Sequence, residues 1–168
     1  MNIIYRMGTI EDLTEIGALV HQAIVNMKQC NIDQWDALYP ISKDFQQDIE
    51  KKQLFVGIVE NEIAVIYVLN QEYDEAYENG EWRYTDTSFY IIHRLCVKPS
   101  FQNCGLAKMT MAHIEKEIKS WGGQSIRLDV FTENPYALKL YKGCGYDIVG
   151  HTHWRKGRFY LMEKGLYY

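Results

Sequence analysis

Strand-like and helix-like patterns of apolar residues alternate along this chain of 168 residues, and their order limits the folds open to it. Runs rich in branched and aromatic residues predict strands at 3–7, 54–59, 63–69, 89–97, 125–131, 146–149 and 159–162. Apolar residues spaced three and four apart predict helices after Thr9, from Ser42, from Ala107 and after Asn134. The order βααβββαβαββ indicates a mixed α/β domain with one central sheet. At roughly 150 residues per domain, we expect residues 1–168 to form a single domain.

The composition excludes several classes of protein. Hydrophobic residues make up 47% of the chain and charged residues 24%, as in an ordinary globular protein and unlike a disordered or collagen-like one. The formal charge of −4 argues against a nucleic-acid partner, because such partners select a basic face. No uncharged apolar run approaches the roughly 20 residues that span a bilayer, so no membrane partner is expected.

The cysteines and the N-terminus indicate the compartment. The four cysteines are Cys30, Cys96, Cys104 and Cys144, and no two of them have the CxxC spacing of a zinc ribbon or a thioredoxin-like motif. The N-terminal residues lack the apolar stretch and cleavage site of a signal peptide. We therefore expect a cytoplasmic protein with reduced thiols and no metal centre.

The segment 95–107 carries the strongest chemical signal. A strand ends before Pro99, a tight loop containing Gly105 follows, and a helix begins at about Ala107. The first turn of a helix leaves backbone N–H groups without partners, and these groups together with the helix dipole attract anions. The segment therefore predicts a site for a phosphate or pyrophosphate group, the alternative being an ordinary connection without a ligand.

Other phosphate-binding motifs do not match. The pattern GxxxxGK[ST] of the P-loop is absent from the chain. The Gly143–Gly145 pair has Ile148 where a GxGxxG fingerprint needs its third glycine, and it closes a predicted helix instead of opening one. Nucleotide hydrolysis and dinucleotide binding are therefore not indicated.

Three segments together resemble a known family. Residues 102–107, Gln-Asn-Cys-Gly-Leu-Ala, resemble the [RQ]xxGx[GA] loop of the GNAT superfamily of acetyl-CoA-dependent N-acetyltransferases, and residues 93–99 resemble the strand that precedes it. Residues 134–146 resemble the family's N-x-x-A-x-x-x-Y-x-x-x-G-[FY] helix. Asn103 and Cys104 replace the glycine or basic residues common in the loop, and binding through backbone amides tolerates that change.

The resemblance implies a fold, an activity and a co-substrate. The fold would be mixed α/β, with a largely antiparallel central sheet flanked by helices. The activity would be transfer of the acetyl group of acetyl-CoA to a primary amine, by direct attack in a ternary complex. The alternatives are a domain that binds acyl-CoA without turnover and an acyltransferase with a longer acyl donor. The acceptor would be a small-molecule or peptide amine, and the chain a monomer or homodimer.

The resemblance also implies the residues that hold acetyl-CoA. The main chain of Leu95, Cys96 and Val97 would pair with the pantetheine arm as an added strand does. Asn134 would contact the cofactor, and Tyr141 would stand near its sulfur. The pyrophosphate would be held by backbone amides of one continuous stretch: Gln102, Asn103, Cys104, Gly105, Leu106, Ala107 and Lys108.

Acetyl transfer assigns a role to two of these positions and to His93. The backbone N–H of Val97 would donate to the developing oxyanion. Tyr141 would protonate the leaving thiolate, unless it is only a core aromatic residue. His93 alternates with Leu95 and Val97 and should share their face of the strand. It would take the proton of the amine, the alternatives being water as the base and a purely structural histidine.

Two further features bear on the acceptor. Trp35 and Tyr39 lie in an irregular segment and are predicted to form a wall of the acceptor pocket, with ordinary core packing as the alternative. The stretch 72–82 carries five acidic residues and is either a solvated loop or a border of the acceptor cleft that favours a cationic amine. His151 and His153 form an HxH pair without a recognisable third metal ligand.

Overall fold

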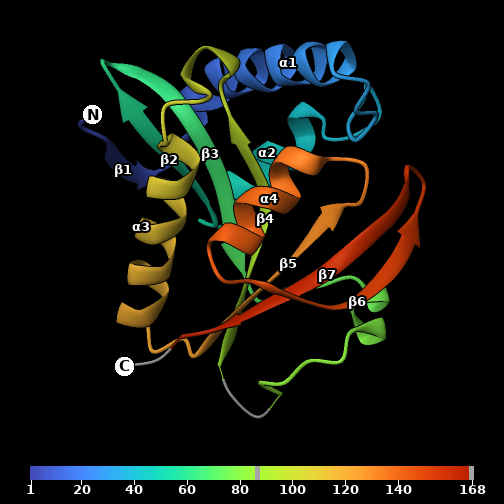
Figure 1. Cartoon of the computed structure of the whole chain (residues 1–168). Coiled ribbons are helices and arrows are strands. Elements are labelled where there is room, and N and C mark those ends of the chain that lie inside the picture. The colour runs from blue at the N-terminus through green and yellow to red at the C-terminus, as the bar shows by residue number, and fades with distance from the viewer. Residues whose placement is uncertain (86–87, 167–168) are drawn as a thin grey trace. The chain divides into compact units, whose positions relative to one another are not determined.

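The computed structural model describes residues 1–85 and 88–166 and contains the predicted elements in the predicted order (Figure 1). The strands are β1 (Ile4–Met7), β2 (Leu54–Val59), β3 (Glu62–Asn70), β4 (Phe89–Val97), β5 (Ser125–Phe131), β6 (Asp147–Trp154) and β7 (Gly157–Gly165). The α-helices are α1 (Leu13–Gln29), α2 (Ser42–Glu50), α3 (Leu106–Ser120) and α4 (Pro135–Gly143). Short 3₁₀ helices are η1 (Ile10–Asp12), η2 (Glu75–Asn79) and η3 (Pro99–Phe101).

The strands form one seven-stranded sheet in the order β1-β2-β3-β4-β5-β7-β6. The pairs β1–β2, β2–β3, β5–β7 and β6–β7 are antiparallel, and β4–β5 is parallel. The parallel ladder joins only the first three residues of β4, from Phe89↔Ser125 to Ile91↔Arg127. The expected mixed α/β fold with a largely antiparallel sheet and flanking helices is confirmed.

The chain divides into two compact units. The first unit contains Met1–Leu69 and Arg94–Ala107, and the second contains Asn70–His93 and Lys108–Tyr168. Strand β4 and helix α3 each contribute residues to both units. Each unit has buried apolar clusters of its own, and one of those in the second unit is formed by Tyr77, Ile91, Val149 and Leu161.

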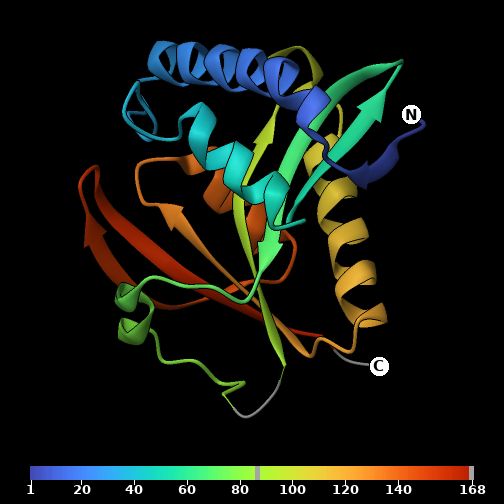
Figure 2. The ribbon, with the colours of Figure 1, turned by 180° about the vertical axis from the view of Figure 1, so that it is seen from behind.

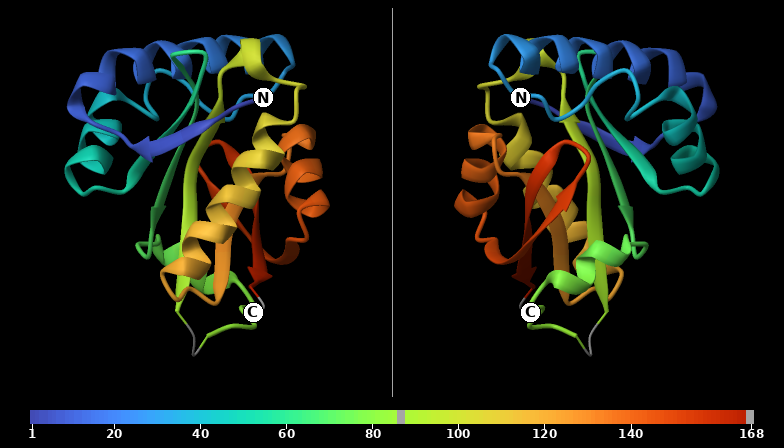
Figure 3. Two further views of the ribbon diagram at one scale, coloured as in Figure 1. Left: turned by 90° about the vertical axis from the view of Figure 1, so that its left-hand side faces the viewer. Right: turned by 90° about the vertical axis from the view of Figure 1, so that its right-hand side faces the viewer.

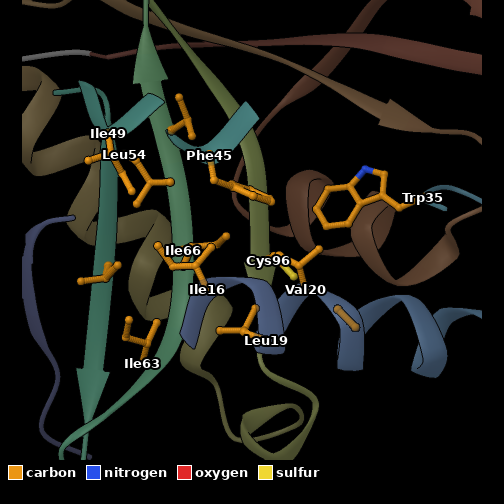
Figure 4. Packing of buried hydrophobic residues seen from close by; sticks show 13 residues of the cluster. Ile16, Leu19, Val20, Trp35, Phe45, Ile49, Leu54, Ile63, Ile66 and Cys96 are labelled. Carbon is orange, nitrogen blue, oxygen red and sulfur yellow. The ribbon is translucent and has the colours of Figure 1, made fainter. Parts of the chain in front are cut away.

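In the first unit, α1 and α2 pack against one face of β2 and β3 (Figure 2). The core of this layer includes Ile16 and Leu19 from α1, Phe45 from α2 and Ile66 from β3 (Figure 4). The buried positions of α1 recur at intervals of three and four residues, which is the amphipathic pattern that predicts the helix. On the opposite face, Leu106 at the start of α3 packs against Val59, Ala64 and Val65.

In the second unit, β6 and β7 form a hairpin beside β5, and η2 lies against β6 (Figure 3). Both hairpin strands are longer than predicted, and the turn between Trp154 and Gly157 contains only two residues. Gly157 has a φ of 136°, which an L side chain rarely adopts. The apolar runs 146–149 and 159–162 mark only part of each strand, because β6 continues through exposed His151 and His153 and β7 extends at both ends beyond its apolar run.

Candidate acetyl-transfer site

The loop between β4 and α3 has an open and unusual backbone. Asn103 has a φ of 59° and Gly105 a φ of 82°, both in the left-handed region. Gln102, Asn103, Cys104 and Gly105 are all exposed, and a Cβ added at Gly105 would meet no atom within 4 Å. The main chain of this loop is therefore accessible to a ligand.

The loop also presents unpaired backbone donors. The N–H of Gln102 donates to the carbonyl oxygen of Pro99. Among the described residues, the N–H groups of Asn103, Cys104 and Gly105 donate to no backbone carbonyl. The first-turn N–H groups of α3 follow directly and have no intrahelical partner by geometry. This donor set suits the oxygens of a phosphate or pyrophosphate group.

Two contacts hold the loop at its ends. Asn26 on α1 donates through Nδ2 to Oε1 of Gln102 at 3.3 Å. The buried side chain of Leu106 fixes the first residue of α3 in the core described above. Sequence reasoning missed Asn26, because 76 residues separate it from Gln102 and nothing in its local pattern marks it.

The backbone of β4 changes direction at Arg94. Arg94 has a φ of 50°, although strand residues on both sides are extended. Leu95 and Val97 pack on the side of Leu106, whereas Cys96 packs with the core of α1 and α2. The expectation that His93 shares a face with Leu95 and Val97 assumed uninterrupted alternation, and the left-handed residue between them removes that basis.

The Arg94 side chain is held in an ion pair whose carboxylate is buried and whose guanidinium is partly buried. Its Nε and one terminal nitrogen donate to the two oxygens of Asp48 on α2, at 2.8 and 2.6 Å, and the other terminal nitrogen donates to the Tyr39 hydroxyl at 2.9 Å. Burial lowers the pKa of Arg94, but Tyr39 and Asp48 raise it more, so the net shift is upward. Burial raises the pKa of the Asp48 carboxyl and Arg94 opposes this effect, and the two short bonds favour the ionised form.

The two residues predicted to form a wall of the acceptor pocket occupy different environments. Trp35 is 8% exposed and belongs to the core cluster of the first unit, beside Cys96 and Val20 in Figure 4. Tyr39 is 40% exposed, and its hydroxyl accepts the bond from Arg94. Trp35 therefore has the packing position that was the alternative, whereas Tyr39 remains accessible.

In the second unit, the half-buried imidazole of His93 contacts an amide. Its Nε2 lies 2.8 Å from Oδ1 of Asn70, the last residue of β3. The parallel pair Ile91↔Arg127 places His93 and Asp129, each two residues further on, on the same face of the sheet. A histidine and a carboxylate thus share one face of the second unit.

Asp129 accepts a hydrogen bond from a buried tyrosine. The hydroxyl of Tyr77 on η2 donates to Oδ2 of Asp129 at 2.6 Å, and the Tyr77 ring stacks on Trp82 at 5.5 Å between centroids. Burial, followed by the charge of Asp129, raises the pKa of Tyr77 well above its ordinary value, so the hydroxyl keeps its proton. Tyr77 thus anchors the stretch 72–82 in the core of the second unit, while its five acidic residues are exposed.

Helix α4 begins and ends where the sequence predicts. Asn134 accepts through Oδ1 from the N–H of Ala137 at 3.1 Å, and Pro135 is the first helical residue. Tyr141 lies two turns further on, is 8% exposed and packs edge-on against Tyr146 at 6.1 Å between ring centroids. The Asn134 side chain thus caps the helix, and its contact with a cofactor stays a prediction.

The HxH pair lies on the exposed side of β6. His151 and His153 line a polar groove with Asn79, Glu81 and Thr152, and their ring centroids are 6.1 Å apart. Across residues 1–85 and 88–166, no cluster of three or more His, Cys, Asp or Glu side chains is arranged to hold a metal ion. No helix in that part of the chain is long and apolar enough to cross a bilayer.

Sequence reasoning missed Asn70, Tyr77 and Asp129. A signal existed for Asp129, because Arg127 and Asp129 place polar groups at alternate positions of an otherwise apolar strand. Asn70 ends an apolar strand and Tyr77 lies in an acidic stretch, and neither pattern identifies its partner. Their partners lie 23 and 52 residues away in the sequence.

Comparison with solved structures identifies the fold. A GNAT-family acetyltransferase from Streptococcus agalactiae has a TM-score of 0.88 at 21% identity, over 99% of this chain and 96% of that one. A Staphylococcus aureus protein for which acetyltransferase activity is proposed has a TM-score of 0.77 at 27% identity, over 98% and 99% of the two chains. A Salmonella typhimurium protein, solved with its cofactor acetyl-CoA, has a TM-score of 0.70 at 12% identity, over 98% and 94%.

A comparison with curated proteins finds no match. The model of the acetyltransferase (GNAT) family matches residues 23–146. This range includes β4, the loop with Gly105, and α4 with the residues that follow it up to Tyr146, which are the segments that carry the motifs. The chain therefore belongs to the GNAT family of acetyltransferases.

Proposed function

We propose that this protein is an N-acetyltransferase that moves the acetyl group of acetyl-CoA to a primary amine by direct attack in a ternary complex. The observation that carries the proposal is the loop 102–105, whose exposed main chain presents unpaired N–H groups at the start of α3. Such a donor set suits the pyrophosphate of acetyl-CoA. The acetyl-CoA in the Salmonella typhimurium neighbour of the same fold supports this choice.

Different segments of the chain bind different parts of acetyl-CoA. The amides from Asn103 to Lys108 hold the pyrophosphate, since the N–H of Gln102 already donates to Pro99, and the main chain of Leu95–Val97 pairs with the pantetheine arm. The parallel ladder of β4 ends at Ile91, before these three residues. Asn134 contributes a further contact near the start of α4. Acetyl-CoA supplies the activated acyl group when it is bound.

Three groups then act on protons and charge. His93 accepts the proton of the acceptor ammonium, which leaves a neutral amine able to attack. The backbone N–H of Val97 donates to the carbonyl oxygen as negative charge develops there. Tyr141 gives its hydroxyl proton to the departing sulfur. Tyr39 borders the acceptor, for which the acidic side chains around η2 favour a cationic amine.

The experiment that tests the function is a screen of acceptors that follows the release of free thiol from acetyl-CoA. Polyamines, amino acids, aminoglycosides and peptide N-termini represent the chemical classes of primary amine. Release that depends on one of these classes supports catalysis. Binding of acetyl-CoA without thiol release in any of them would mean a domain that binds the cofactor without turnover, and faster turnover of longer thioesters would identify a different acyl donor.

The cofactor site has its own test in two matched glycine variants. Gly105 and Gly122 have φ values of 82° and 83°, and neither has an atom within 4 Å of an added Cβ. Gly105→Asp and Gly122→Asp therefore cost similar backbone strain, but only the first puts a carboxylate among the proposed pyrophosphate donors. We expect calorimetry to show a loss of acetyl-CoA affinity of at least about tenfold in Gly105→Asp alone. Equal affinities in folded variants would contradict the assigned site.

A further inference from the structure

The contact between His93 and Asn70 links the proposed base to a buried amide. Asn70 is 8% exposed and ends β3, and its Oδ1 lies 2.8 Å from Nε2 of His93. Both residues belong to the second unit. A buried polar side chain at this distance restricts the orientation of the imidazole ring.

A backbone group determines which way the amide of Asn70 faces. The N–H of Glu72 donates to Oδ1 of Asn70 at 3.0 Å, and a backbone N–H acts only as a donor. The Asn70 Nδ2 lies on the other side of the amide, 3.4 Å from Oε2 of Glu72. The atom that faces His93 is therefore the oxygen, which acts only as an acceptor.

The orientation of the amide determines the tautomer of the imidazole. Because Oδ1 accepts, Nε2 of His93 must carry the hydrogen that it donates. In the neutral ring the lone pair then lies on Nδ1. In the protonated ring the same Oδ1 continues to accept from Nε2, which stabilises the positive charge.

We propose that Asn70 is a positioning residue for acetyl transfer, which keeps His93 in the Nε2-protonated tautomer so that Nδ1 accepts the proton of the acceptor. This inference rests on the proposed function. The N–H bond of the ammonium breaks and an N–H bond forms at Nδ1. The freed amine nitrogen then bonds to the acetyl carbon as the carbon–sulfur bond breaks, and the sulfur receives the proton of Tyr141. The nitrogen loses its second proton to the Tyr141 oxygen through water, which leaves a neutral amide and restores the hydroxyl, and His93 releases its proton to solvent. Asn70 touches His93 and none of the reacting atoms.

Other charged groups share the surroundings of His93. The strand register places three of them on the same face of the sheet as His93: Arg127 and Asp129 on β5 and Glu163 on β7. The hydroxyl of Tyr77, from η2, donates to Asp129. Glu72 lies beyond Asn70. Arg127, Asp129, Glu163 and Tyr77 are unchanged in the variants at residue 70, so a difference between these variants reports the change at residue 70 and at Glu72, which contacts it.

The first test adds a negative charge at residue 70 and keeps the shape of its side chain. Asn70→Asp preserves an acceptor oxygen toward His93 and stabilises the protonated imidazole, which raises the pKa of His93. Proton acceptance by His93 requires the neutral ring, so the acidic limb of kcat/KM for the amine should move upward by about one pH unit. The control is Asn79→Asp, which makes the same substitution at an amide that contacts Thr152. The acidic limb of kcat/KM should not move in this variant. An unmoved limb in a folded Asn70→Asp protein overturns the proposal.

The second test observes the tautomer of His93 directly and begins with the unaltered chain. Nitrogen-15 NMR of labelled histidine, above the pH of the acidic limb, should show His93 with Nε2 protonated and Nδ1 unprotonated. Asn70→Leu removes the acceptor, so a mixture of tautomers should appear and kcat should fall about tenfold, with acetyl-CoA affinity unchanged. Protonation at Nδ1 in the unaltered protein overturns the proposal.

A third variant distinguishes this inference from the function on which it rests. His93→Gln should abolish the acidic limb if His93 is the base. An acidic limb that persists in His93→Gln overturns both the base assignment and the proposed role of Asn70 in transfer, whereas thiol release that persists still supports the acetyltransferase. If the acidic limb disappears in His93→Gln but keeps its position in Asn70→Asp, only the role of Asn70 is overturned.

Discussion

At the scale of single residues, Tyr141 combines a local and a tertiary constraint. The cap at Asn134 and the proline after it start α4, so the position of Tyr141 two turns later follows from helix geometry. Its ring is buried and packs against Tyr146. The hydroxyl is therefore held in one place, as a proton donor to the thiolate must be.

Tyr141→Phe separates the role of the hydroxyl from that of the ring. The phenylalanine keeps the packing against Tyr146 but removes the proposed proton donor. Loss of general acid catalysis costs about 10²–10⁴-fold, and water compensates in part, so we expect kcat to fall at least about tenfold. Thiol release at saturating amine measures kcat, and a binding titration should show little change for acetyl-CoA.

Tyr136 supplies the matched control for this variant, because it lies on the same helix and is 69% exposed. Tyr136→Phe should leave both measurements unchanged. A wild-type kcat in Tyr141→Phe would reduce Tyr141 to a packing residue. Loss of acetyl-CoA binding in Tyr141→Phe would instead give it a positional role and leave the acid to another residue.

At the scale of elements, the ion pair between Arg94 and Asp48 joins β4 to α2. Asp48 lies on the buried side of α2, and Arg94 reaches it from a left-handed position in the strand. A non-glycine residue in that region is strained, and such strain persists only where surrounding contacts maintain it. The bidentate bond to Asp48 is the contact that maintains it here.

Asp48→Asn tests this connection through stability. The change keeps the size of the side chain but leaves the partly buried Arg94 guanidinium without a counter-charge. Removing one partner of a buried pair costs about 3 kcal/mol, and we expect that loss in the free energy of unfolding measured with urea. Glu50→Gln, an exposed change on the same helix, should alter it by less than about 0.5 kcal/mol. Similar values for both variants would mean that the pair contributes little.

At the scale of the whole molecule, three of the four cysteines report on the core and on the loop. Cys30 and Cys104 are exposed, and Cys96 is buried in the core of the first unit. Burial raises the pKa of Cys96 to about 12. At pH 8 only about 10⁻⁴ of such a thiol is ionised, and the thiolate is the form that alkylating reagents attack.

Alkylation of the native chain, read residue by residue by mass spectrometry, should therefore modify Cys30 and Cys104 and spare Cys96 until urea unfolds the protein. Acetyl-CoA should slow the modification of Cys104, which lies in the proposed pyrophosphate loop. Cys30 should react at the same rate with and without acetyl-CoA and is the internal control. Rapid labelling of Cys96 in the native protein would contradict its burial in the core. Equal labelling of Cys104 with and without acetyl-CoA would contradict the assignment of the loop as the pyrophosphate site.

Much of the fold was predictable because it depends on near neighbours in the chain. The spacing of Met111, Ile114 and Ile118 predicts the buried side of α3, and all three are buried. The strands 54–59, 89–97 and 125–131 have the predicted bounds. The loop with Gly105 and the capped start of α4 were likewise visible, because backbone conformation and helix capping involve residues only a few positions apart.

The sequence by itself thus determined the elements, their order and the candidate cofactor loop. Only the tertiary structure decided which side chains meet: Arg94 with Asp48, 46 residues apart, His93 with Asn70, 23 apart, and Tyr77 with Asp129, 52 apart. It also placed Trp35 in the core and gave Arg94, within β4, a left-handed backbone conformation. Hydrogen bonds and ion pairs between distant residues depend on how the chain packs, and no local pattern of propensities records that packing.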